Sequence, residues 1–292
     1  MRSRWSRVLR ALGQSLNLLP PSTLAAVRPP RQYAGLLVST ACCVAVILEF
    51  YPGLLSYDSI DQLTQARTGA YSDLHPPLMA VWWGWLDRLL PGPGGMLVAQ
   101  NMLFWSAVGL LSSSFAGGWR QALLPVALLL TPAVLSPVGT IWKDVWMTSF
   151  LVWALALVQL THRTSRHWPL ALAVLALVLA CSFRHNAFIA AAPLCIAISW
   201  HRFPGWAGLK VSVVGLVLLA SVVVSSTFLT RALRTAPSSY PEQQILIHDL
   251  SAISLSAREE LFPEEFLQTA PRCTLDNIRI AYEISNVCGL VY

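Results

Sequence analysis

The sequence has few charged side chains, since only 12% of its 292 residues are Asp, Glu, Lys or Arg. It also lacks a P-loop, a Rossmann glycine pattern, an HExxH motif and a Gly-x-Ser-x-Gly elbow. No internal repeat occurs, and no run shows the alternation of apolar and polar residues that membrane strands need. These absences remove the assignments to nucleotide-binding enzymes, zinc proteases and serine hydrolases that such motifs would support.

Hydrophobic residues make up 55% of the chain, which has a mean hydropathy of +0.57 and 12 tryptophans. This composition is typical of integral membrane proteins. Several apolar runs approach the length of about 20 residues that crosses a hydrocarbon core as a helix. The sequence therefore predicts an all-α polytopic membrane protein with about seven transmembrane helices. The predicted spans are residues 33–50, 96–115, 121–138, 145–160, 168–183, 187–200 and 208–229.

The distribution of charge predicts an orientation. The net charge of +6 comes from basic residues dispersed in short segments between the spans, unlike the basic surface of a nucleic-acid-binding domain. The arginines before residue 33 place the N-terminus in the cytoplasm and, after seven spans, the C-terminus outside. All fourteen acidic residues then lie on or near the outer side. We expect no nucleic-acid partner.

The chain divides into three predicted segments. Residues 1–32 form a basic cytoplasmic segment, either a helix on the membrane surface or a disordered tail. Residues 33–229 form the transmembrane bundle, with an outer loop at 51–94 whose short Trp-rich helix at 79–90 lies along the membrane surface. Residues 230–292 form a small outer segment of helices, expected to pack on the bundle or to be incomplete. Within it, Cys273 and Cys288 can pair if that compartment is oxidising.

The most polar stretch, residues 57–78, is the first part of a candidate site. Asp58 and Asp61 are three residues apart and share one face of a helix. Two carboxylates there offer a general base for an acceptor hydroxyl, and a divalent metal position is left open. The alternative is structural: Asp58 caps a helix that begins at Ser59, and Asp61 is merely solvated.

His75 precedes Pro76 and Pro77, which disfavour a helical backbone at His75 and so aim its imidazole reproducibly. The alternative is an ordinary loop end that introduces the next helix.

Two further polar groups, Lys143-Asp144 and Arg184-His185-Asn186, lie at predicted span ends on the same outer face. Charges near hydrocarbon indicate function by default, and outward-facing cations suit a phosphate. The alternatives are that Lys143 extends to the interface and that Arg184 forms a structural ion pair with Asp144.

These motifs together resemble a known family. The chain has a membrane span, an outer loop with an early aspartate, His75-Pro76-Pro77-Leu78, a short interfacial helix and then many spans. This order resembles the GT-C membrane glycosyltransferases, especially the protein mannosyltransferase and aminoarabinose-transferase-like branch. Residues 51–77, with Trp142-Lys143-Asp144 and Arg184-His185-Asn186, are also similar to a less characterised bacterial family of such membrane proteins. The resemblance covers residues 45–230.

The resemblance implies a multi-pass protein of the bacterial cytoplasmic membrane that transfers a sugar from a polyprenyl-phosphate carrier. The acceptor would be a lipid, glycan or protein on the outer face, and the reaction would proceed with inversion and without a nucleotide sugar. Asp58, or Asp61 in its place, would act as the base or orient the acceptor. Arg184 and Lys143, with His185, would hold the carrier phosphate, and His75 would shape the sugar pocket.

Three other classes of function stay open on the sequence. A transporter or flippase predicts charged or broken positions in mid-span, whereas the charges here lie at span ends. A truncated or non-catalytic membrane protein predicts that Asp58, His75 and Arg184 point away from one another. A membrane acyltransferase is the third, although no His-x4-Asp pattern is present.

Overall fold

The computed structural model describes residues 33–73, 75–114, 118–236, 243–269 and 274–282. The predicted basic segment 1–32 and the predicted Cys273–Cys288 pair lie outside the described residues. Within the described ranges the protein is all-helical and has no β-strand, only an isolated bridge between Leu54 and Thr140. The predicted fold class was an all-α polytopic membrane protein with about seven transmembrane helices, and its all-α character with apolar helices is confirmed.

The helices follow the predicted order. They are α2 (Ala34–Phe50), α3 (Tyr57–Thr68), α4 (Leu78–Leu89), α5 (Gly94–Ser112), α6 (Arg120–Leu129), α7 (Pro132–Gly139), α8 (Lys143–Thr164), α9 (Trp168–Phe183), the 3-10 turn η2 (His185–Ala187), α10 (Phe188–Arg202), α11 (Gly208–Leu233), α12 (Gln243–Ala257), α13 (Glu264–Thr269) and α14 (Leu275–Tyr282).

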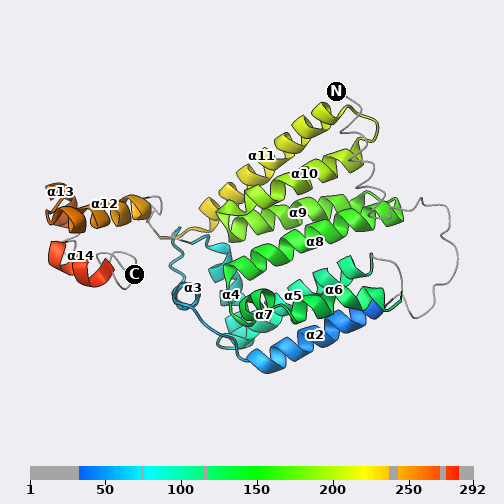
Figure 1. Cartoon of the computed structure of the whole chain (residues 1–292), viewed down its shortest axis with the longest axis horizontal. Coiled ribbons are helices and arrows are strands. Elements are labelled where there is room, and N and C mark those ends of the chain that lie inside the picture. Colours follow the sequence, from blue (N-terminus) through cyan, green and yellow to red (C-terminus); the bar gives the residue numbers. More distant parts are fainter. Residues whose placement is uncertain (1–32, 74, 115–117, 237–242, 270–273, 283–292) are drawn as a thin grey trace.

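Helices α2 and α5 to α11 form a bundle (Figure 1), in which α8 packs on α9, α9 packs on α11, and α11 packs on α10. Helix α8 also packs on α5, which in turn packs on α2. Small residues allow close approaches between neighbours: a Cβ atom at Gly215 of α11 would lie 2.8 Å from the Ile196 Cα atom of α10. Such contacts are typical of helices that pack within a membrane.

Among the described residues, three helices are long and apolar enough to cross a membrane, namely α5, α8 and α11. The pair α6 and α7 counts as a fourth span if it crosses as one unit, although its halves meet at a bend of 68°. Helices α2 and α9 are apolar but shorter. A helix or helix pair therefore occurs at each predicted span, whereas the number of crossings and their direction stay predictions.

The break between α6 and α7 differs from the single helix predicted at 121–138. Thr131 has an extended backbone, with φ −90° and ψ 111°, and Pro132 follows it. A proline disfavours the helical region for the residue before it, and its ring removes a hydrogen-bond donor. The helix consequently ends at Leu129 and restarts at Pro132.

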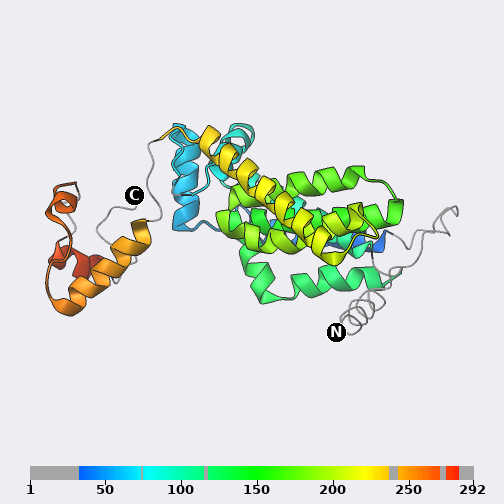
Figure 2. The ribbon, with the colours of Figure 1, turned by 90° about the horizontal axis from the view of Figure 1, so that it is seen from above.

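One end of the bundle carries the polar segments. Helices α3 and α4 lie at the end from which the chain leaves for its C-terminal helices (Figures 1 and 2). The start of α8 and the end of α9 lie at the same end, through their contacts with α3 and α4. Helix α4 matches the predicted short helix at 79–90 within a residue. The predicted convergence of the polar segments on one end of the bundle is thus seen.

Helices α12, α13 and α14 form a small cluster of their own. Phe262 and Ile278 are its buried centre. Both views show this cluster apart from the bundle (Figures 1 and 2). The packing on the bundle that the sequence led us to expect is not seen among the described residues.

Candidate functional site

An aromatic stack fixes the base of the site. The ring of Trp146 in α8 lies parallel to the ring of Phe183 in α9, with 5.2 Å between centroids and 3° between planes. Both side chains are buried. Trp146 lies within one helical turn of Lys143, and Phe183 directly precedes Arg184. The stack therefore holds the start of α8 against the end of α9, and with it the two cations predicted to act together.

The segment that leads into α8 is also held by the loop before α3. Leu54 N–H donates to the Gly139 carbonyl at 3.0 Å, and Ile141 N–H donates to the Leu54 carbonyl at 2.9 Å. The Ser59 hydroxyl donates to the Ile141 carbonyl at 2.5 Å. These bonds place the first turn of α3 beside Lys143.

Two amide side chains of α5, which the sequence analysis did not single out, also hold the segment that leads into α8. The Gln100 amide nitrogen donates to the carbonyls of Val138 and Thr140 at 3.0 and 2.8 Å. The amide nitrogen of Asn101 donates to the same Val138 carbonyl at 2.9 Å. These bonds satisfy carbonyls left free at the end of α7, as a buried helix end requires. The available signal was a pair of adjacent amides inside a predicted span.

Helix α3 is capped by Ser56, so the structural alternative, in which Asp58 caps a helix beginning at Ser59, was wrong. The Ser56 hydroxyl accepts from the Ser59 backbone N–H, and the Ser59 side chain accepts from the Ser56 N–H, which completes a capping box. Serine caps as well as aspartate does. Asp58 instead lies in the first turn, where a negative charge is favourable, and its carboxylate is free of the capping role.

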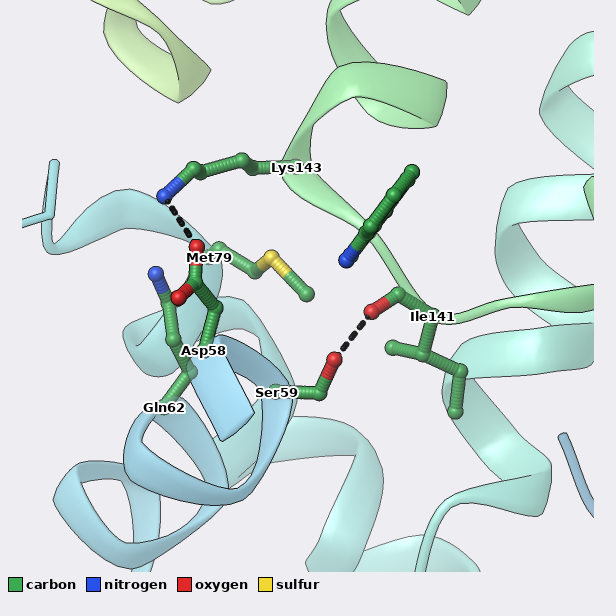
Figure 3. A pocket seen from close by; sticks show the side chains of 7 residues that line it. Asp58, Ser59, Gln62, Met79, Ile141 and Lys143 are labelled. Carbon is green, nitrogen blue, oxygen red and sulfur yellow. Dashed lines mark hydrogen bonds and ion pairs between the residues drawn. The ribbon is translucent and has the colours of Figure 1, made fainter. Parts of the chain in front are cut away.

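The Asp58 carboxylate contacts two of the predicted residues. The Lys143 Nζ atom lies 2.8 Å from Asp58 Oδ2 and 2.8 Å from His75 Nδ1. Figure 3 shows the Lys143 and Asp58 side chains pointing toward each other beside Met79. An ammonium group only donates, so His75 Nδ1 accepts and the imidazole proton is assigned to Nε2. That nitrogen lies 3.6 Å from Asp58 Oδ1 and is buried without a hydrogen-bond partner.

This contact fixes the charge of Asp58. The imidazole of His75 and the ammonium of Lys143 lower the pKa of the Asp58 carboxyl far below its ordinary value of 3.8, although partial burial opposes them. Asp58 is consequently ionised at neutral pH. The Lys143 side chain is only 11% exposed and that of Asp58 is 40% exposed, so solvent and ligands reach the carboxylate more easily than the cation.

Arg184 forms the second pair. Its Nη1 atom donates to Asp144 Oδ2 at 2.7 Å, and its Nε atom donates to Asn186 Oδ1 at 3.2 Å. The structural ion pair considered from the sequence is therefore present. Both charged side chains are about one-third exposed. In the described chain, His185 in the η2 turn makes no hydrogen bond to either network.

Asp61 has a hydrogen-bond partner different from those of Asp58. The Gln65 amide nitrogen donates to Asp61 Oδ2 at 2.6 Å and to the Ser72 hydroxyl at 3.2 Å. Asp58 and Asp61 thus bond to different partners, and the joint role of the two carboxylates stays a prediction. Within the described ranges no group of three or more His, Cys, Asp or Glu side chains is placed to hold a metal ion.

An apolar groove of about 360 Å³ lies next to the ion pair. Helices α5 to α8 line it, with side chains such as Phe104, Val108, Val134 and Val152. Its polar members are few, and Asp144 is one of them. Trp142 lines both this groove and the small hollow that contains Asp58 and Lys143. The groove and the charged site are therefore neighbours that share Trp142.

Comparisons with known proteins add no family assignment. No family model, curated protein or solved structure matches this chain. The resemblance to the GT-C glycosyltransferases rests on the motifs of the sequence alone.

Proposed function

We propose that this protein is a membrane glycosyltransferase that transfers a sugar from a polyprenyl-phosphate carrier to an acceptor hydroxyl. The observation that carries the proposal is the contact of Asp58 with Lys143 and His75, beside an Arg184–Asp144 pair and an apolar groove. The reaction requires a carboxylate for the acceptor hydroxyl, cations for the carrier phosphate and an apolar groove for the lipid chain, and the site has all three.

The carrier phosphate is assigned to the cationic side of the site. Arg184 has five N–H donors and uses two of them on Asp144 and Asn186. The remaining donors can hold a phosphate in the fork geometry that arginine favours. Lys143 and the N-terminus of α8 add positive potential nearby. These groups would stabilise the negative charge that develops on the phosphate as the sugar leaves.

The hydrocarbon chain of the carrier is assigned to the groove. Its lining is almost wholly apolar, and Asp144, the partner of Arg184, lies at its wall. A lipid whose phosphate meets Arg184 would therefore place its first isoprene units against α7 and α8. Burial of such units stabilises binding by roughly 25 cal/mol for each Å² of apolar surface removed from water.

The acceptor is assigned to Asp58. The acceptor oxygen attacks the anomeric carbon, the bond from that carbon to the phosphate oxygen breaks, and the hydroxyl proton passes to the Asp58 carboxylate. A single displacement inverts the anomeric centre. Because its pKa is low, Asp58 is a weak base that mainly orients the hydroxyl and accepts the proton late. The His75 Nε2–H, buried 3.6 Å from Asp58 Oδ1, would keep that carboxylate aimed at the acceptor hydroxyl.

The proposal includes the predicted topology. Seven spans with a cytoplasmic N-terminus place the site and the C-terminal helices on the outer face of a bacterial cytoplasmic membrane, where membrane lipids, glycans or proteins are the acceptors. The outer side suits this reaction, because the polyprenyl-phosphate sugar is the donor and no nucleotide sugar is needed there.

The test is a transfer assay with purified protein in lipid nanodiscs and a panel of defined undecaprenyl-phosphate sugars. Asp58→Asn and Arg184→Ala should each lower the rate by about 100-fold or more, in line with the loss of a charge-stabilising group. Arg67→Ala is the matched control, since its ion pair with Asp87 lies at the same end and outside the site. Unchanged transfer in both site variants would refute the assignment.

A further inference from the structure

The loop that carries His75 is tied to the end of α11. The Tyr71 N–H donates to the Thr235 hydroxyl at 2.8 Å, and that hydroxyl donates to the Gly69 carbonyl at 2.7 Å. The backbone N–H groups of Thr235 and Ala236 both donate to the Tyr71 carbonyl, at 3.0 and 2.9 Å. One threonine thus connects segments more than 160 residues apart in the chain. We call residues 69–73 with residues 234–236 the clasp.

An ion pair completes the clasp. Arg234 Nη1 lies 2.7 Å from Asp73 Oδ2, and the Asp73 side chain is only 16% exposed. Shielding from solvent strengthens such a pair relative to one at the open surface. Within the loop, Ser72 N–H also donates to the Gln65 side-chain carbonyl at 3.0 Å, which ties it to α3.

His75 lies directly beyond these contacts. Asp73 is two residues before it, and α4 begins three residues after it, at Leu78. Pro76 and Pro77 restrict the backbone between His75 and α4. The clasp and α4 therefore anchor the segment that presents the imidazole, on its two sides. We therefore expect that freedom gained at the clasp would let the imidazole move relative to Lys143 and Asp58.

We propose that Thr235 and Arg234 are positioning residues that hold His75 in contact with Lys143 and beside Asp58. The inference rests on the proposed function for what His75 then does, and on the contacts alone for the positioning. Thr235 and Arg234, at the end of α11, would thus affect the site through His75, although neither residue lines the site.

The test measures the reactivity of each histidine toward diethyl pyrocarbonate, by mass spectrometry of the intact folded protein in detergent. Thr235→Val removes the hydroxyl and keeps the side-chain shape, so His75, which is 16% exposed in the native contact, should react about fivefold faster. That factor is the change in population that lost hydrogen bonds worth about 1 kcal/mol produce. Thr235→Ser keeps the hydroxyl and should retain the native rate.

Two controls separate positioning from general loosening. His201, whose ring contacts His162 at the other end of the bundle, should react at an unchanged rate in every variant. Thr227→Val removes a hydroxyl of α11 that bonds only within its own helix, and it should leave His75 unchanged. An unchanged His75 rate in Thr235→Val, or an equal rise at His201, would overturn the inference. A selective rise at His75 with normal transfer would support the clasp and refute the catalytic part proposed for His75.

Discussion

At the residue scale, the site depends on a cation that has little access to water. Lys143 is almost buried, and its ammonium group has the Asp58 carboxylate and the His75 ring nitrogen as partners. Removal of one partner lowers the free energy of unfolding by more than the contact itself contributes, because the remaining charge stays desolvated without its partner. Solvent reaches Asp58, which reduces this cost. Asp58→Asn should therefore lower stability by about 1–3 kcal/mol as well as lowering activity.

The charge of Asp58 predicts an acid-dependent loss of stability. Its pKa in the folded protein lies below the ordinary value of 3.8, so its contribution is complete above that pH and is lost as the pH falls further. Thermal unfolding in detergent between pH 7 and pH 3 should show the wild type losing its advantage over Asp58→Asn only below about pH 4. A difference that stays constant across that range would show that the Asp58 charge contributes nothing.

Individual residues also show how far the sequence could predict the site. Asp58, His75, Lys143 and Arg184 were identifiable because charged groups are rare in this chain and lie at the ends of apolar runs. The supporting contacts were not. The hydrogen bond from Ser59 to the Ile141 carbonyl joins residues 82 positions apart, and such a contact produces no periodic sequence pattern from which it could be predicted. Helical spacing predicted that Asp61 shares a face with Asp58, but it could not predict that Gln65 is the hydrogen-bond partner of Asp61.

At the element scale, the break between α6 and α7 matters most. After the break, the C-terminal end of α7 is held by Gln100 and Asn101 of α5, and side chains of α6 and α7 form one wall of the groove. Apolar length predicted one helix there, since hydropathy does not report a bend. The proline at position 132 was visible in the sequence, but the angle of 68° depends on what the two halves pack against.

The groove predicts that a large side chain will block the donor. Thr148 of α8 lines the groove and is exposed within it. Thr148→Trp should weaken the binding of undecaprenyl phosphate by about tenfold while leaving the Asp144–Arg184 pair intact, because it occupies space assigned to the isoprene units. Val213→Trp, on an exposed position of α11, is the matched control. Equal binding by both variants in a nanodisc titration would place the lipid elsewhere.

At the scale of the whole molecule, the topology depends on whether the bent pair crosses the membrane. If α6 and α7 cross as one unit and α8 returns, the loops at Gly118 and Ser165 lie on the same, cytoplasmic side. Fusions of green fluorescent protein at both positions should then fluoresce, and alkaline phosphatase fusions at both should be inactive. Active phosphatase at position 165 alone would show that the pair re-enters without crossing, and the predicted seven spans would be wrong.

The central claim also concerns the whole molecule. It is that one polyprenyl-phosphate ligand occupies the groove, contacts the Arg184–Asp144 pair and reaches the Asp58 contact. Titration of wild-type protein in nanodiscs with undecaprenyl phosphate, and with undecaprenol as the uncharged equivalent, measures that ligand directly. The account predicts tighter binding of the phosphate, weakened by about 10-fold to 100-fold in Arg184→Ala, the loss expected for charge-assisted hydrogen bonds. Arg67→Ala should bind as the wild type does. Equal affinity for the two lipids, or equal affinity in the two arginine variants, would contradict the account.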